Sequence, residues 1–295
     1  MSPHLRRALH WAGSALALAG VIFVGLRLET YWADIDTSHI EPAIYMAVGS
    51  MMLAYSLANL LLIEGWRRLL AKLGARTTPR WAIRVYGVSQ LAKYIPGNVF
   101  HLAGRQVMGV AAGAPSRALA KSMPWEFGLI ALAGATYAWT AVPLLLPTFS
   151  NFLSGVLVLL TALTVTCLLW RFIGAAFAEC FALQSVFLAV SAGIFIVLMA
   201  AVLPHRAMGF NTVLLIGGAY ILAWLGGFLS PGAPAGVGIR EMILLILLKD
   251  IAADADLLLA ILVGRLVTVA GDLVLFVITL CLPAELYEKG SCNES

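Results

Sequence analysis

The chain has 295 residues, of which 61% are hydrophobic and only 12% are charged, and its mean hydropathy is +0.94. Because a soluble domain carries about a quarter charged residues, this composition excludes a soluble globular protein and predicts an all-α polytopic membrane protein. The net charge of +4 is typical of basic cytoplasmic loops, so we expect no nucleic-acid partner. The four cysteines lack the spacing of a metal site or a disulfide framework, and we expect neither a metal nor a cofactor.

Apolar runs of about 20 residues, the length that crosses the hydrocarbon core of a bilayer, predict about six transmembrane helices. These runs lie near 8–26, 43–63, 122–145, 152–170, 183–203 and 257–281. We expect the first run to be a membrane anchor, because it is too long for the apolar region of a signal peptide. The whole chain, 1–295, is expected to form a single transmembrane domain.

Two further segments, about 81–112 and 212–248, contain Pro-Gly breaks, in KYIPGN at 93–98 and in SPGAPAGVGIRE at 230–241. Proline removes a backbone donor, and opened backbone at membrane depth persists only inside protein or beside a wet cavity. We therefore predict two re-entrant helical hairpins, with a pair of full crossings as the alternative for either segment. Corresponding breaks in the two halves of a chain indicate a transporter's binding site.

The distribution of charge predicts the orientation in the membrane. Basic residues precede the first span and crowd the loop 66–84, whereas the connection after the first span is acidic. Because Lys and Arg mark cytoplasmic loops, we expect a multi-pass protein of the plasma (inner) membrane with both termini in the cytoplasm. The first hairpin then opens toward the cytoplasm and the second toward the outside, which makes them an inverted pair.

The first hairpin offers an anion site. His101 and Arg105 are four residues apart and share a helix face, with Tyr94 and Asn98 as polar neighbours. A helix that begins after Gly97 would direct its N–H groups and positive dipole end inward, which suits a phosphate. The fork of donors on Arg105 fits the same ligand; the alternative is an arginine that extends to the cytoplasmic surface.

The second hairpin repeats this pattern. Gly236 and Gly238 permit close approach of the backbone, and Arg240 in the following helix is a second candidate anion ligand. We expect Glu241 to pair with Arg240, because adjacent opposite charges inside a protein are usually partners; a proton-coupling carboxylate is the alternative.

Three more charges lie in the predicted spans, where each is expensive and needs a partner. Glu126 is placed to pair with Arg105. Arg265 and Asp272 are seven residues apart on one face of the last span, where we expect an interhelical structural network. The chain contains no HExxH, GxSxG or P-loop motif, so we do not expect an enzyme, nor ATP as a direct energy source.

The Tyr94-to-Gly97 segment followed by Arg105, then Glu126, then GVGIRE at 236–241 resembles the lysylphosphatidylglycerol synthase transmembrane region, also called the flippase-like domain family. Arg265 and Asp272 resemble later polar positions of that family. The resemblance implies a lipid translocase that moves an anionic phospholipid or a polyprenyl-phosphate-linked glycolipid between leaflets. Members fused to an aminoacyl-transferase domain move aminoacylated phosphatidylglycerol, but we expect no such domain here. The bulky residues at 98–101 depart from the family pattern and point to a different head group.

These observations predict a flippase in which Arg105 and Arg240 bind the phosphate. The remaining candidates at the substrate site are Tyr94, Gly97, Asn98, His101, Gly236 and Gly238, and the charge-balancing or coupling candidates are Glu126, Glu241, Arg265 and Asp272. The expected partners are a membrane lipid or a lipid-linked sugar, with a glycosyltransferase or a second copy of the chain as further candidates. Two alternatives stay open: an accessory protein of a membrane glycosyltransferase that moves no lipid, and a membrane-embedded lipid-modifying enzyme.

Overall fold

A computed structural model of the protein describes residues 42–95, 100–146, 148–203, 208–230, 234–283 and 287. Every regular element within these ranges is a helix, so the predicted all-α class is confirmed for the described part of the chain. Five of its helices are long and apolar enough to cross a membrane: Met46–Lys72, Asn151–Phe172, Ala175–Val202, Phe210–Leu229 and Ala255–Cys281. The first predicted span, 8–26, lies outside the described residues.

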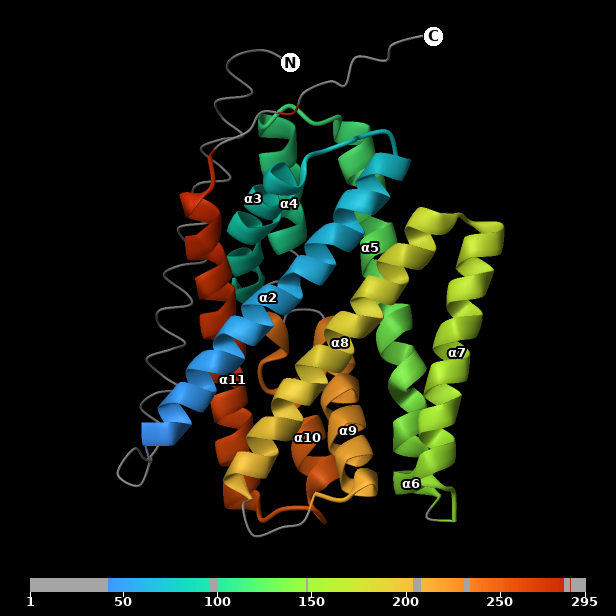
Figure 1. The fold of residues 1–295 in the computed structure, drawn as a ribbon, viewed down its shortest axis with the longest axis vertical. Coiled ribbons are helices and arrows are strands. Elements are labelled where there is room, and N and C mark those ends of the chain that lie inside the picture. Colours follow the sequence, from blue (N-terminus) through green and yellow to red (C-terminus); the bar gives the residue numbers. More distant parts are fainter. Residues whose placement is uncertain are drawn as a thin grey trace.

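Four long helices run from one end of the molecule to the other (Figure 1). They contain four of the predicted spans and are α2 (Pro42–Lys72), α7 (Asn151–Phe172), α8 (Ala175–Val202) and α11 (Asp254–Cys281). Helix α8 packs against both α2 and α11. Helix α7 exposes large apolar side chains such as Phe152, Leu159 and Phe172, which is expected of a helix whose solvent is hydrocarbon.

The predicted span 122–145 is not one helix. The structure has α5 (Ser116–Thr136), a 3₁₀ turn η2 (Tyr137–Ala141) and the short α6 (Val142–Leu145) in its place. The hydroxyls of Thr136 and Thr140 donate to the carbonyls of Ala133 and Tyr137, three residues back. Pro143 at the start of α6 has no N–H to donate to a carbonyl of the preceding turn, which interrupts the regular helical ladder here. Pro124 lies inside α5 and removes another ladder bond near its start.

The segment predicted as the first hairpin forms two short helices. These are α3 (Pro79–Gln90), which continues into the 3₁₀ turn η1 (Leu91–Tyr94), and α4 (Phe100–Ala111). Thr78 caps α3 by accepting a hydrogen bond from the Trp81 amide. Each helix has 12 residues and is about 18 Å long, so neither crosses a hydrocarbon core of about 30 Å by itself. Both lie at the same end of the molecule (Figure 1).

The second hairpin is asymmetric. It consists of α9 (Phe210–Leu229), the 3₁₀ turn η3 (Pro234–Gly236) and α10 (Ile239–Leu248). Helix α9, with 20 residues, is long enough to cross a membrane, whereas the 10 residues of α10 span only about 15 Å. Gly236 has φ +71°, and a Cβ on it would lie 2.7 Å from the Cα of Gly227. The close packing of the second hairpin at its tip therefore requires glycine at both positions.

The two hairpins come from opposite ends of the molecule, and their tips meet inside the bundle (Figure 1). We call η1 tip one and η3 tip two. The tips contact each other through a small buried cluster that joins Leu91 and Tyr94 of tip one, Ala235 of tip two and Val269 of α11. This meeting point contains most of the ionisable side chains that the sequence predicted to be buried.

Candidate functional site

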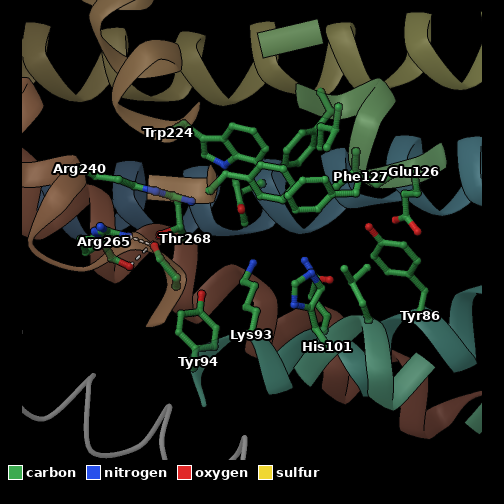
Figure 2. Close-up of a pocket in the computed structure, with 18 residues that line it drawn as sticks. Tyr86, Lys93, Tyr94, His101, Glu126, Phe127, Trp224, Arg240, Arg265 and Thr268 are labelled. Atoms are coloured by element: carbon green, nitrogen blue, oxygen red, sulfur yellow. Dashed lines mark hydrogen bonds between the residues drawn. The ribbon is translucent and has the colours of Figure 1, made fainter. Parts of the chain in front are cut away.

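A cavity of about 80 Å³ lies beside the two tips. This volume is well above the ~10–15 Å³ that a cavity needs to hold one water molecule. Basic and polar groups line its middle, and aromatic rings form much of its wall (Figure 2). The lining residues that the site's chemistry uses are Tyr86, Lys93, Tyr94, His101, Glu126, Phe127, Trp224, Phe228, Arg240, Arg265 and Thr268.

Tip one is anchored to α11 through Asp272. This carboxylate is fully buried and lies 2.6 Å from Nζ of Lys93. The same oxygen, Oδ2, accepts a 2.5 Å hydrogen bond from the hydroxyl of Tyr94. Asp272 was predicted to be part of an interhelical network, and the structure places it there with partners on the first hairpin.

Tip two is anchored to the same helix through Arg265. Its Nε donates to Glu241 at 2.6 Å, and its two terminal nitrogens donate to the carbonyls of Ala235 and Gly236 at 3.0 and 3.1 Å. Arg265 is therefore in an interhelical network, as predicted. The predicted pair of Glu241 with Arg240 is wrong, because Glu241 pairs with Arg265. Adjacent residues on a helix do not face each other, so Arg240 and Glu241 diverge.

Arg105 and Glu126 form the ion pair that the sequence predicted. Nη1 of Arg105 donates to both oxygens of Glu126, and its guanidinium carbon lies 3.6 Å from the ring centroid of Tyr86. Arg105 is only 1% exposed and is not among the residues that line the cavity, whereas Glu126 is. In this structure Arg105 therefore neutralises and positions Glu126, and it does not reach the space where a phosphate would bind.

Arg240 differs from the other buried cations. Its Nε is buried without a hydrogen-bond partner, and its guanidinium carbon lies 5.5 Å from the Trp224 ring centroid. Around the cavity, Lys93, Arg105 and Arg265 each have a carboxylate partner, while no described carboxylate forms an ion pair with Arg240. The described part of the site thus carries one uncompensated positive charge. Figure 2 shows the Arg240 side chain reaching over Arg265 toward the centre of the cavity.

Glycine makes room for this side chain. A Cβ on Gly227 would lie 2.6 Å from Cγ and 2.8 Å from Nε of Arg240, and a Cβ on Gly236 would lie 2.9 Å from the same Nε. The stem of Arg240 therefore crosses the glycine contact at tip two. Gly238 has φ +86° and precedes α10, but no atom lies within 4 Å of the position of its Cβ. Of the two predicted glycines in the second hairpin, only Gly236 touches the anion-binding candidate.

The other predicted site residues have mixed positions. Tyr94 and His101 line the cavity, and Nδ1 of His101 is buried without a partner. Gly97 and Asn98 lie outside the described residues. Lys93 also lines the cavity but was not predicted to be a site residue. Its charge beside the Pro-Gly break was the signal in the sequence that could have identified it. It also missed the aromatic wall, because rings such as Phe228 in an apolar span look like any membrane-facing side chain.

Comparison of the chain with family models, with curated proteins and with solved structures gave no match. The family resemblance therefore rests on the motifs in the sequence. Within the described residues, no group of three or more His, Cys, Asp or Glu side chains is arranged to hold a metal ion. The chemistry of the site must be argued from its own charges, hydrogen-bond donors and rings.

Proposed function

We propose that the protein is a lipid translocase whose cavity binds the phosphate of an anionic lipid. The observation that carries the proposal is Arg240, a half-buried cation whose Nε is buried without a partner and which forms no ion pair with a described carboxylate. A charge that is partly withdrawn from water and has no ion-pair partner is unfavourable, and an anion in the cavity would compensate it. The guanidinium is the side chain best shaped to bind a phosphate through two donors at once.

The other cavity groups favour the same ligand. Lys93 and His101 face the cavity beside Arg240 (Figure 2) and add hydrogen-bond donors on the side of tip one. Thr268 of α11 also lines the cavity, but its hydroxyl donates to the carbonyl of Arg265. A phosphate group with its four oxygens can use the donors of Arg240, Lys93 and His101, while the surrounding rings can accommodate the less polar part of a head group. The family resemblance extends the proposed class to an anionic phospholipid or a polyprenyl-phosphate-linked glycolipid.

The arrangement of the hairpins supports a translocation mechanism. Basic residues gather at the end of the molecule where the first hairpin opens, and include Lys72, Arg76, Arg80, Arg117 and Lys121. The connection between α10 and α11, at the opposite end, carries Asp250. With basic ends in the cytoplasm, the two hairpins enter the plasma (inner) membrane from opposite sides as re-entrant elements, and both termini are cytoplasmic. Inverted elements that meet at one site allow access to alternate between the two sides, with no covalent step.

The test is translocation of fluorescent lipids in proteoliposomes. We expect transport of phosphatidylglycerol or a polyprenyl-phosphate sugar and none of zwitterionic phosphatidylcholine. Arg240→Met should abolish transport, and Arg240→Lys should reduce it by about tenfold or more, because the ammonium keeps the charge but loses the bidentate fork. Lys249→Met is the matched control, since Lys249 is an exposed cation on the connection just after α10. Equal transport by the wild type and Arg240→Met would contradict the proposal, as would the absence of transport for every anionic lipid.

A further inference from the structure

One wall of the cavity is made of three stacked aromatic rings. Trp224 and Phe228 of α9 stack with ring centroids 4.9 Å apart and planes 12° from parallel. Phe127 of α5 stacks on Phe228 at 4.6 Å and 29°. All three rings line the cavity, and Figure 2 shows Trp224 and Phe127 along the same side of it. The wall of the cavity between α5 and α9 is therefore built of side chains at this point.

Elsewhere the helices around the site are joined more closely. Gly134 of α5 packs against Leu225 of α9, where a Cβ would lie 3.1 Å from the leucine. Gly271 of α11 packs against α2, where a Cβ would lie 2.9 Å from the carbonyl oxygen of Met52. At such contacts an opening requires that whole helices separate. At Phe127 and Phe228, rotation of two rings about their side-chain torsions is enough.

The rings also stand at the boundary of the protein. Phe127 and Phe228 are partly exposed, and the residues beside them reach the surface: Trp125 is 38% exposed and Leu229 is 51% exposed. Pro124 lies three residues before Phe127 and leaves a backbone carbonyl of α5 without its regular donor. Proline is a common cause of bending in helices, so α5 can adjust next to the ring contact.

A translocated lipid imposes a geometric requirement. Its head group must enter a polar cavity of about 80 Å³, whereas its hydrocarbon chains favour the bilayer in proportion to their length. The hydrocarbon chains cannot fit in the cavity. The part of the lipid that links the head group to its chains therefore has to cross the cavity wall. Unlike the glycine contacts, the wall closed by Phe127 and Phe228 can open without separating helices.

We infer that the contact between Phe127 and Phe228 is the lateral portal through which the hydrocarbon chains of the lipid extend into the bilayer while its phosphate is bound in the cavity. The inference rests on the proposed function and adds the binding site for the apolar part of the substrate. Phe127 and Phe228 line the head-group cavity and are themselves partly exposed, so the two rings lie between the cavity and the outside of the bundle. The occupant is therefore the chain of the bound lipid itself.

The portal can be closed by a reversible cross-link. Phe127→Cys and Phe228→Cys, in a background without the native cysteines, are bridged by a short bis-maleimide with an internal disulfide. The bridge should lower transport of fluorescent phosphatidylglycerol by at least about tenfold, and reduction should restore it. Binding of water-soluble glycerol phosphate, which has no hydrocarbon chain, should be unchanged. Gly134→Cys with Leu225→Cys, bridged in the same way, is the matched control on the same two helices and should change transport less than about twofold.

The outcomes separate the two proposals. Transport by the bridged 127/228 protein at its unbridged rate overturns the portal, and so does an equal block by the 134/225 bridge. A wild-type protein that moves no anionic lipid overturns the proposed function and the portal with it. If the cysteines at 127 and 228 prevent folding, phosphatidylglycerol with a photoreactive diazirine on its chain tests the wild type. Label within 125–130 and 224–229 supports the portal, and absence of label from both segments overturns it.

Discussion

Replacing an arginine of the site by methionine should lower stability when the arginine has an ion-pair partner, and should leave it unchanged or raise it when the arginine has none. Methionine is unbranched, flexible and apolar, so it fills much of the space of an arginine stem. Arg105→Met leaves the carboxylate of Glu126 buried without its ion-pair partner. Arg240→Met removes a cation that has no described carboxylate partner. The first change creates an uncompensated charge, whereas the second removes one.

The sizes of these effects follow from burial. Breaking a buried ion pair from one side costs about 3–5 kcal/mol, and we expect this cost for Arg105→Met, where both side chains are buried. For a chain of this size, that corresponds to a melting temperature roughly 6–20 °C lower. Arg265→Met should cost less, about 1–3 kcal/mol, because the side chain of Glu241 is 21% exposed. Arg240→Met should leave stability unchanged or raise it by about 1 kcal/mol.

The measurement is the melting temperature of each purified variant in the same detergent, followed by transport in proteoliposomes. We expect Arg240→Met to be at least as stable as the wild type and yet inactive, a combination typical of a residue kept for function at the expense of stability. Arg105→Met should be destabilised. A melting temperature of Arg240→Met as low as that of Arg105→Met would refute the reasoning, because it would mean that Arg240 has a structural partner.

Two further substitutions test the contacts at the tips. Asp272→Asn should destabilise the protein by about 1–3 kcal/mol, because it leaves the ammonium of Lys93, whose side chain is 17% exposed, without its counter-charge. Adding Lys93→Met to the same chain should recover most of the lost melting temperature, and no recovery would mean that the two residues are not coupled. Gly227→Ala should cost about 1–3 kcal/mol through overpacking against the Arg240 stem, and Gly128→Ala, where no atom lies within 4 Å of the new Cβ, should be neutral; similar melting temperatures for the two alanine variants would contradict this packing.

The sequence was sufficient to predict the all-helical class and four of the long helices, because a hydrocarbon solvent leaves a clear pattern of apolar runs. It also predicted the pair of Arg105 with Glu126, since charges in such runs are few and have few choices of partner. It did not predict the interruption at 137–141. Pro143 at the start of α6 removes a ladder donor there, and a single proline changes the hydropathy of a 20-residue window little.

The partners of Lys93 and Glu241 were harder to predict. Asp272 is 179 residues from Lys93 along the chain, and only the packing of both hairpin tips against α11 brings such groups together. Adjacency in sequence favoured Arg240 as the partner of Glu241, but helix geometry directs neighbouring side chains apart. The stacked rings at 127, 224 and 228 are apolar residues in apolar segments. Nothing in composition distinguishes them from side chains that simply face lipid.

Helix α11 holds the tips of both hairpins, and this shared attachment bears on how well the membrane retains its ion gradients. Asp272 holds tip one and Arg265 holds tip two, and their separation of seven positions corresponds to about 10 Å of one continuous helix. A rigid rod fixed to both tips links their movements, so withdrawal of one tip shifts the position of the other. Two hairpins tied in this way would not open independently. In the proposed translocation, this coupling would prevent a continuous water path across the bilayer, and the shared helix would protect the ion gradients of the cell while a charged head group crosses.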